Sequence, residues 1–341
     1  MTKTSHRSIA NSQTPKCQGR RLCLIGLIVL LSVFGSMSAI GEERTLEIDV
    51  AGVTRSAVVV VPDDTRINDQ LPLVLAFHGS SWNGRVMQQT TGFSELAEQE
   101  KFIVAYPNGS GPSNILSWNA EFCCSFALER NVDDLSFVDL LLDKLIASYP
   151  VDPSRVYATG FSNGGMFAYM LAIERPEQFA AIAVVSGAMY ATQQPSNIAV
   201  PMLIIHGTDD SVIPYSGGWG ALRTLSGKTE PAVSAVDAAS FWIANNGCPS
   251  SEPVISRERT ARIQTYIGCR DNTDVVFITL LEGGHDWPVI ERNESDFLLT
   301  DDAVDLFTVL ADANASEELA WDVFEVGLDA SVTIWEFFSN H

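Results

Sequence analysis

The sequence predicts an α/β fold in which helices cover both faces of a doubly wound, mostly parallel β-sheet. Two observations lead to this fold class. Short, unbroken apolar runs alternate along the chain with segments whose apolar residues recur at helical spacing. One of these runs ends in Gly160-Phe161-Ser162-Asn163-Gly164, and a helical pattern follows it directly. Such a junction is typical of a sharp turn that projects the serine from the edge of a sheet.

Seven apolar runs are predicted to be strands. They lack the alternation of apolar and polar residues that one solvent-facing side would require, so both faces of the sheet are expected to be buried. The runs are Ser56–Val61, Leu73–Phe77, Phe102–Tyr106, Arg155–Thr159, Ala180–Val185, Met202–Ile205 and Val275–Leu281.

Four helices are predicted between and after these strands. The first is capped by Asp134 and runs to about Ser148, with its leucines and valine on one face. The second starts at the serine turn and runs to about Glu174. The third spans Ser234–Asn246, and the last begins at Asp329.

Residues 1–41 are predicted to be a cleaved signal peptide. They contain five basic residues and no acidic one, and Arg20-Arg21 precede the apolar run Leu22–Phe34, which small residues follow. A basic segment, an apolar segment and a small-residue cleavage zone are the marks of an export signal. The apolar run is short for a membrane span, although an uncleaved anchor is the alternative. We therefore expect a secreted protein, extracellular or periplasmic, with no stable membrane association after cleavage.

Residues 42–341 are predicted to form a single domain, and this domain is strongly acidic. The whole chain has a net charge of −21 and is 46% hydrophobic; beyond residue 41 it has 16 basic and 42 acidic residues. A domain this acidic repels phosphate backbones, which excludes nucleic acid as a partner.

The segment 289–326 differs from the rest of the domain. It carries eleven acidic residues and one basic residue, Arg292, with apolar residues interleaved. We expect an insertion whose helices have a solvated acidic face, and a partial cap beside the functional site is the alternative. A calcium site at Asp301, Asp302 and Asp305 would lack the EF-hand spacing, so no metal site is predicted.

Four cysteines lie beyond the predicted signal peptide. Cys248 and Cys269 flank one loop and are predicted to form a disulfide, which would stabilise the fold by roughly 3 kcal/mol. Cys123 and Cys124 are adjacent, and they either stay reduced or bond to each other. The sequence contains no Cys-x-x-Cys pair, which argues against a zinc site.

Ser162 is the candidate nucleophile. Its Gly-x-Ser-x-Gly motif stands in the strand–turn–helix context of a nucleophile elbow, where flanking glycines let neighbouring main chain approach closely. This context narrows the predicted fold to the α/β-hydrolase fold.

A serine hydroxyl needs a base, and the base needs an acid to orient it. His285 follows two glycines on a loop after a late strand, which is where this architecture places its base. Two adjacent aspartates follow His206. Asp210 is favoured over Asp209, because the acid usually lies four residues beyond this histidine. The order Ser162, Asp210, His285 is that of α/β hydrolases.

Two backbone N–H groups are expected to stabilise the oxyanion of a tetrahedral intermediate. One belongs to Asn163, directly after the nucleophile. The other is expected from Ser80, with Ser81 as the second choice. Four aromatic residues on or near these loops are predicted to contact the substrate, namely Trp82, Trp118, Tyr215 and Trp287.

In these motifs the chain resembles the secreted polyhydroxybutyrate depolymerase-like esterases, a family close to the feruloyl and acetylxylan esterases of carbohydrate esterase family 1. The resemblance covers roughly residues 70–290 and the C-terminal helix. It implies that Ser162, Asp210 and His285 form a catalytic triad. Besides the elbow, it rests on Leu73–Gly79, Ala105–Gly109, Trp118–Ala120 with Cys123-Cys124, Val132–Phe137, Asp152–Tyr157, His206–Asp210, Asn246–Cys248, Tyr266–Cys269, Gly283–Pro288 and Ile334–Phe338.

The chain departs from this family at 289–326, where a shorter loop rich in glycine and proline is expected. It also shows no polymer-binding module and no linker rich in serine and threonine, which weighs against attack on an insoluble polyester.

The sequence thus predicts a secreted serine carboxylic ester hydrolase that needs no cofactor and works through an acyl-enzyme. The expected substrates are hydroxycinnamoyl or acetyl esters of polysaccharide, or 3-hydroxybutyrate oligomers. A serine peptidase on the same fold is the alternative.

Overall fold

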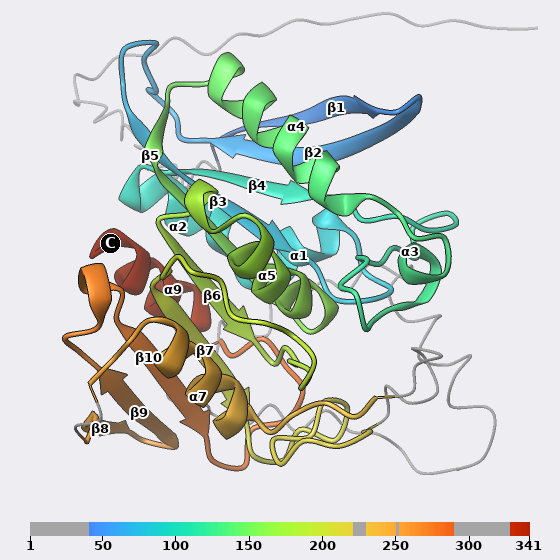
Figure 1. The fold of residues 1–341 in the computed structure, drawn as a ribbon. Coiled ribbons are helices and arrows are strands. Elements are labelled where there is room, and N and C mark those ends of the chain that lie inside the picture. Colours follow the sequence, from blue (N-terminus) through green and yellow to red (C-terminus); the bar gives the residue numbers. More distant parts are fainter. Residues whose placement is uncertain (1–40, 221–229, 250–251, 290–327) are drawn as a thin grey trace, which may run out of the picture. The chain divides into compact units, whose positions relative to one another are not determined.

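A ten-stranded β-sheet forms the centre of the computed structural model, which describes residues 41–220, 230–249, 252–289 and 328–341 (Figure 1). Within these residues the strand order is β1-β2-β4-β3-β5-β6-β7-β10-β9-β8. The strands from β4 to β10 in this order pair in parallel, and antiparallel strands extend both edges. The predicted doubly wound, mostly parallel sheet is therefore confirmed. The strands are β1 Glu42–Val50, β2 Val53–Val61, β3 Leu71–Phe77, β4 Ile103–Pro107, β5 Val151–Phe161, β6 Ala181–Val185, β7 Met202–Gly207, β8 Val254–Glu258, β9 Ala261–Tyr266 and β10 Val275–Leu280.

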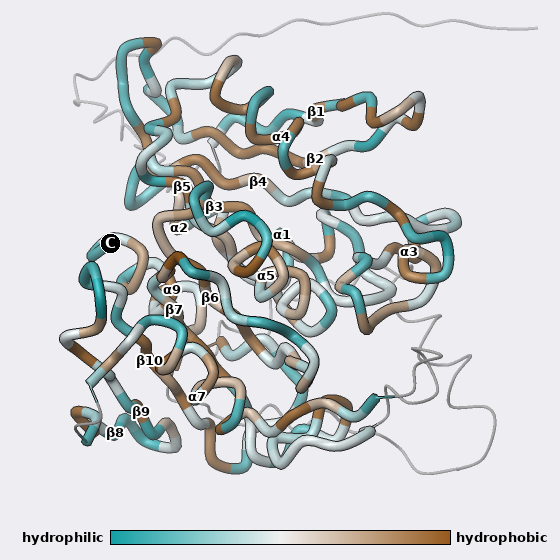
Figure 2. The backbone as a smooth tube through the Cα atoms, viewed as in Figure 1, coloured by the Kyte–Doolittle hydropathy of each residue, from teal (hydrophilic) through white to brown (hydrophobic). Residues whose placement is uncertain are grey.

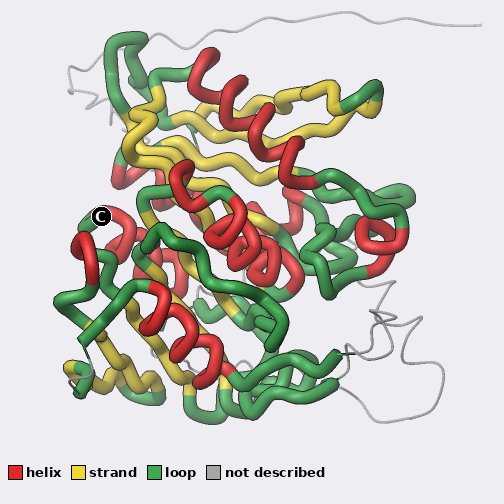
Figure 3. Tube along the Cα trace, in the orientation of Figure 1, coloured by secondary structure: helices red, strands yellow, loops and turns green. Residues whose placement is uncertain are grey.

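Helices cover both faces of this sheet, and they alternate with strands along the chain (Figures 1 and 3). Helices α4, α5 and α7 bury their apolar sides in one core, and α1, α2 and α9 bury theirs in the other. The four predicted helices correspond to α4, α5, α7 and α9. The helices are α1 Gly84–Thr91, α2 Phe93–Glu100, α3 Ser125–Glu129, α4 Asp134–Ser148, α5 Asn163–Glu174, α7 Ala235–Asn245 and α9 Ala330–Ser339, with short 3₁₀ turns at η1 Pro176–Gln178 and η2 Arg270–Asn272.

Strand β3 shows why the central strands are apolar without interruption. Leu73, Leu75 and Phe77 enter the core beneath α4 and α5, whereas Val74 and Ala76 enter the core beneath α1 and α2. All five side chains are fully buried. Because successive side chains point to opposite faces, a sheet covered on both sides needs apolar residues at every position. The brown colour of the central strands in Figure 2 reflects this requirement.

Two edge hairpins were not predicted from the sequence. They are β1–β2, of which only the β2 part was expected, and β8–β9. Nearly all of β1 and the whole of β8 are exposed or partly exposed. Strands that bury so little surface carry mostly polar side chains, so a search for apolar runs does not find them.

The start of α4 corrects one prediction. The capping residue is Asp133, whose Oδ1 accepts a hydrogen bond from Ser136 N at 3.0 Å. Asp134, the expected cap, is buried and pairs with Arg55 of β2, with 2.7 Å between Oδ1 and Nη2. Its Oδ2 accepts the main-chain N–H of Asn119 at 2.8 Å. This pair therefore joins β2, α4 and the loop that contains Asn119.

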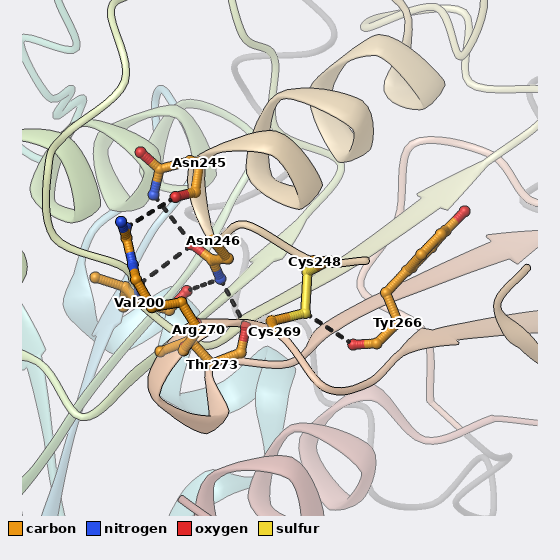
Figure 4. Close-up of a disulfide and its surroundings, with 8 residues drawn as sticks. All are labelled: Val200, Asn245, Asn246, Cys248, Tyr266, Cys269, Arg270 and Thr273. Carbon is orange, nitrogen blue, oxygen red and sulfur yellow. Dashed lines mark hydrogen bonds between the residues drawn. A yellow bond between two sulfur atoms is a disulfide. The ribbon is translucent and has the colours of Figure 1, made fainter. Parts of the chain in front are cut away.

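A disulfide joins Cys248 to Cys269 and ties the end of α7 to the segment before β10 (Figure 4). The fully buried side chain of Asn246 strengthens this junction. Its Nδ2 donates to the main-chain oxygens of Val200 at 2.7 Å and Thr273 at 2.8 Å. The structure also pairs Cys123 with Cys124.

Two predicted segments fall outside the described residues. They are the signal peptide 1–41, except for Gly41, and the acidic segment 289–326, except for Val289. Over the ranges that the structure describes, no helix has the length and apolar character needed to cross a membrane.

Loss of the buried Arg55–Asp134 pair should destabilise the protein strongly. In Asp134→Asn the guanidinium stays buried without its counter-ion, which costs about 3–5 kcal/mol. Glu43→Gln is the matched control, because Glu43 pairs with Arg85 at the surface and exposed pairs contribute about 1 kcal/mol or less. Urea unfolding measures both variants, and equal losses would contradict this view of the buried pair.

Candidate active site

Ser162 occupies a strained turn between β5 and α5. Its φ of 54° and ψ of −117° are unusual for a residue with a side chain, and such strain is concentrated at functional sites. The turn is held on both sides, since Ser162 N donates to Val185 O at 3.0 Å and Ser162 O accepts from Met166 N at 2.9 Å. The sequence motif therefore forms the sharp elbow that it predicts.

The two flanking glycines are required by close approach of the main chain. A Cβ on Gly160 would lie 2.2 Å from Gly164 O, and a Cβ on Gly164 would lie 2.2 Å from Phe77 O. Both distances are too short for any side chain. The elbow is thus packed directly against the end of β3, which brings the loop after β3 next to Ser162.

His285 connects Ser162 to Asp210. Its Nε2 lies 2.9 Å from Ser162 Oγ, and its Nδ1 lies 2.7 Å from Asp210 Oδ2. A carboxylate only accepts hydrogen bonds, so Nδ1 carries the proton and Nε2 is free to accept the serine proton. Ser162 and Asp210 are buried, and the His285 side chain is 15% exposed.

Hydrogen bonds hold the segments at the ends of β7 and β10 together. Asp209 N donates to Gly283 O at 2.9 Å, Thr208 N donates to Leu280 O at 2.9 Å, and Glu282 N donates to Thr208 Oγ1 at 2.8 Å. The adjacent parallel strands therefore deliver acid and base at one edge of the sheet, as expected for open α/β sheets.

The Asp210 carboxylate receives hydrogen bonds on both oxygens. Oδ1 accepts from the N–H groups of Val212 at 2.9 Å and Ile213 at 2.7 Å. Oδ2 faces His285 and, at 3.4 Å, Nε2 of His206. Burial acts to raise the pKa of Asp210, but the hydrogen bonds from His206 and His285 outweigh burial and lower this pKa to about 2. Asp210 is therefore ionised in the folded protein at neutral pH.

Asp209, the alternative acid, does not take part in this arrangement. It is exposed, and its Oδ1 accepts only from Thr208 Oγ1, at 3.0 Å, among the hydrogen bonds of the described residues. The structure brings Asp210, and not Asp209, to His285.

His206 also lies at the site, where it has a role of its own that was not predicted from the sequence. It is buried, and its Nε2 lies 2.8 Å from Ile213 O as well as near Asp210. Both neighbours are acceptors, so Nε2 carries a proton and His206 adds a donor to the acid. The sequence contained a signal for this contact, because His206 lies at the end of one strand and Asp210 follows it by four residues.

Two main-chain donors lie beside the nucleophile. In the described part of the chain, neither Ser80 N–H nor Asn163 N–H has an acceptor. A Cβ on Gly79 would lie only 3.5 Å from Ser162 Cβ, so the loop that carries Ser80 passes directly beside the elbow. Ser81, the second choice, donates its N–H to Leu116 O at 2.8 Å and is not available.

The structure corrects the predicted substrate contact of Trp118. This side chain has no exposed surface and donates from Nε1 to His78 O at 3.0 Å. It cannot touch a substrate in this arrangement, because it lies within the core under the end of β3.

Trp287 is also buried, contrary to the prediction that it contacts substrate. It is 5% exposed, packs edge-to-face against Phe93 and Phe161, and donates from Nε1 to Ser331 Oγ at 3.1 Å. Trp287 therefore fastens the His285 loop to α9. Its closeness to the base in sequence was the misleading signal.

The other two aromatic residues are half-buried. Trp82 stacks on Phe161 with 5.1 Å between ring centroids, and Phe161 in turn packs against the His285 ring. Tyr215 bonds through its hydroxyl to Thr279 Oγ1 at 2.9 Å. Contact of Trp82 and Tyr215 with substrate stays a prediction.

The arrangement can move a proton and stabilise negative charge with protein groups alone. His285 Nε2 can take the proton of Ser162, and two N–H groups can receive an oxyanion. Across the described ranges, no group of three or more His, Cys, Asp or Glu side chains is placed to hold a metal ion.

A parallel sheet with a serine elbow at its carboxyl edge defines the class of α/β hydrolases. The solved structure of an acetyl xylan esterase from Aspergillus awamori shares this fold. It has a TM-score of 0.52 and 19% sequence identity, and the match covers 72% of this chain and 95% of that one.

The sequence profile of the Esterase family, described as "Putative esterase", matches residues 51–287. The chain therefore belongs to this esterase family and is a carboxylic ester hydrolase. It is 30% identical to "Probable feruloyl esterase C" of Aspergillus niger over 273 residues, which are 77% of this chain and 88% of that relative. It is also 30% identical to a bifunctional acetylxylan esterase/xylanase of Neocallimastix patriciarum over 172 residues, which are 50% of this chain and 24% of that relative.

Titration of Asp210 should make stability depend on pH in the acid range. Its pKa falls from an ordinary value of 3.8 to about 2 on folding. Because the folded value is the lower one, the carboxylate stabilises the fold above about pH 4. This contribution, about 2 kcal/mol in full, is lost as the pH falls through 2, with about half gone by pH 3.

Asp210→Asn removes this dependence. The difference in unfolding free energy between wild type and this variant should shrink by about 1 kcal/mol between pH 5 and pH 3, as measured by urea unfolding. Asp209→Asn serves as the control, and a difference between wild type and Asp210→Asn that does not vary with pH would contradict the lowered pKa.

Proposed function

We propose that this protein is a secreted serine esterase that cleaves hydroxycinnamoyl or acetyl esters of plant polysaccharide through an acyl-enzyme on Ser162. The observation that carries the proposal is the continuous hydrogen-bonded chain from Asp210 through His285 to Ser162, with distances of 2.7 and 2.9 Å. The names of the relatives support this choice of substrate, because one is named as a feruloyl esterase and another as an acetylxylan esterase.

The reaction follows from the positions of these groups. Ser162 Oγ attacks the ester carbonyl while His285 Nε2 takes its proton, and Asp210 orients the resulting imidazolium and stabilises it. The oxyanion of the tetrahedral intermediate accepts hydrogen bonds from Ser80 N–H and Asn163 N–H. Collapse of the intermediate expels the alcohol, which receives the proton from His285. Water, activated by the same nitrogen, then releases the carboxylic acid and restores Ser162.

Export is part of the proposal. The composition of residues 1–41 has the three parts of a signal peptide. The disulfide between Cys248 and Cys269 also fits an oxidising compartment.

A second substrate class is 3-hydroxybutyrate oligomers. The motifs that resemble polyhydroxybutyrate depolymerase-like esterases, among them the elbow and the loop at His206–Asp210, favour it. It differs from the first class in the acyl group and uses the same residues.

Ser162→Ala should abolish ester hydrolysis. We expect kcat to fall by at least roughly 10⁴-fold, because no other group supplies the nucleophile. The assay compares methyl ferulate, acetylated xylan and 3-hydroxybutyrate oligomers, with amides of the same acids alongside. Ser240→Ala, at an exposed position on α7, is the control. Full activity of Ser162→Ala would overturn the mechanism, and faster cleavage of amides than of esters would favour a peptidase.

The two adjacent aspartates give a second test of the mechanism. Asp210→Asn should lower kcat by roughly 10⁴-fold, because the asparagine no longer holds His285 in the tautomer that accepts the serine proton. The kcat of Asp209→Asn should stay close to that of wild type, since this side chain is exposed and bonds to Thr208 Oγ1 instead of His285. The kcat of both variants on methyl ferulate is measured, and the opposite ranking would reassign the acid.

A further inference from the structure

Trp118 is fully buried, although it lies in a loop without helix or strand. Aromatic rings hold its indole on several sides. Phe77 meets it edge-on with 5.2 Å between ring centroids, and Phe167 and Phe137 stack nearly parallel to it at 5.2 and 6.4 Å. These rings come from β3, α5 and α4, so the indole has one fixed orientation relative to the sheet.

The main chain of Trp118 holds the side chain of Asn163. Trp118 N donates to Asn163 Oδ1 at 2.8 Å, and Asn163 Nδ2 donates to Trp118 O at 3.1 Å. Both amide functions of a fully buried asparagine are thereby used. The same residue offers its main-chain N–H beside Ser162, so this pair of bonds fixes one donor of the proposed oxyanion hole.

The indole of Trp118 holds the loop that carries the other donor. Its Nε1 donates to His78 O at 3.0 Å. The His78 ring is buried against Trp118, with 5.0 Å between ring centroids, and its Nε2 accepts the N–H of Gly109 at 3.0 Å. Burial lowers the pKa of His78 to about 4, so the ring is neutral at pH 7 and Nδ1 carries its proton.

That proton orients the peptide group of Ser80. His78 Nδ1 donates to Gly79 O at 2.7 Å. In a trans peptide the carbonyl oxygen and the following N–H point in opposite directions. The bond from His78 to Gly79 O therefore directs Ser80 N–H away from the ring. Trp118 Nε1 thus holds His78, His78 holds Gly79 O, and the position of Gly79 O sets the direction of Ser80 N–H.

We propose that Trp118 is a positioning residue that holds both donors of the oxyanion hole, Asn163 N–H through its main chain and Ser80 N–H through its indole. The inference rests on the proposed function, because it assumes that these two N–H groups receive the oxyanion. Donors must lie about 2.7–3.1 Å from the oxyanion to stabilise it. If these donors move, the protein should stabilise the transition state less, whereas its affinity for the ester in the ground state should not change.

Trp118→Phe tests the indole bond, since it keeps an aromatic ring and removes the Nε1 donor. Trp242→Phe is the matched control. Trp242 is equally buried and stacks on Tyr169, but its Nε1 has no acceptor among the described residues. On the best ester of wild type, Trp118→Phe should lower kcat by about 10- to 100-fold with KM within about twofold of wild type. Trp242→Phe should keep both constants within about twofold.

Two inhibitors distinguish a misplaced oxyanion hole from a general loss of structure in Trp118→Phe. A boronic acid that forms a tetrahedral adduct with Ser162 should bind Trp118→Phe more weakly by a factor close to the loss in kcat. The carboxylic acid product should bind as it does to wild type. A raised KM with kcat unchanged would instead make Trp118 a determinant of substrate binding, and equal kcat losses in Trp118→Phe and Trp242→Phe would leave it a packing residue. Either result overturns the proposal.

Asn163→Ala is the second variant, in case Trp118→Phe does not fold. It breaks the main-chain tie to Trp118 and keeps the N–H of residue 163. The same fall in kcat at constant KM is expected, and a variant with wild-type kcat would refute this tie. The Ser162→Ala result separates the two levels of inference. If Ser162→Ala stays active, the proposed function is wrong and this inference falls with it. If only Trp118→Phe or Asn163→Ala behaves as wild type, the positioning role alone is wrong.

Discussion

The site depends on how closely the main chain packs at the carboxyl ends of β3 and β5. Gly164 approaches Phe77 O, and Gly160 approaches Gly164 O, at distances that no side chain would allow. This contact sets the unusual backbone angles of Ser162 and places the loop after β3 at its side. The strands behind it are buried on both faces, so the turn cannot relax without disturbing both cores. The position of the nucleophile is thus a consequence of sheet packing.

The histidines His78, His206 and His285 have different roles because different groups surround their ring nitrogens. His285 meets a carboxylate on one nitrogen and a hydroxyl on the other, which suits it to move a proton. His206 meets two acceptors through Nε2, so it serves as a donor to Asp210. The His78 ring donates to the carbonyl of Gly79 and accepts the N–H of Gly109, and burial keeps it neutral. It therefore connects the main chain of the loop after β3 to the main chain of the loop after β4. His206 lies near the carboxyl end of β7, whereas His78 and His285 lie on the loops after β3 and β10, and position along the chain alone does not distinguish their roles.

Much of the fold was predictable from the sequence, because a parallel sheet covered on both faces leaves long apolar runs. The elbow was predictable as well, since close approach at Gly160 and Gly164 requires glycine. Burial of individual side chains was not. Trp118 and Trp287 were assigned to substrate as aromatic residues near the loops of the site, yet both are enclosed by rings from distant elements. Asp133 and Asp134 are adjacent acids at a helix start, and the sequence does not show which one caps the helix and which one meets Arg55 in the interior. The exposed strands β1 and β8 leave no apolar run to detect.

The loop around Trp118 shows how a segment without helix or strand can be held in one conformation. Each polar group of Trp118 has a partner, with N and O bonded to Asn163 and Nε1 bonded to His78. The next residue, Asn119, donates its N–H to Asp134, whose charge is balanced by Arg55. The Arg55 guanidinium lies over the Phe137 ring, 4.1 Å from its centroid, and Phe137 stacks on Trp118. Replacing both partners of a buried ion pair by apolar residues often costs little stability, whereas removing one partner leaves the other charge buried and unpaired. The pair of Arg55 and Asp134 therefore ties the loop next to Trp118 to β2 and α4, and the same loop is bonded to the elbow through Asn163.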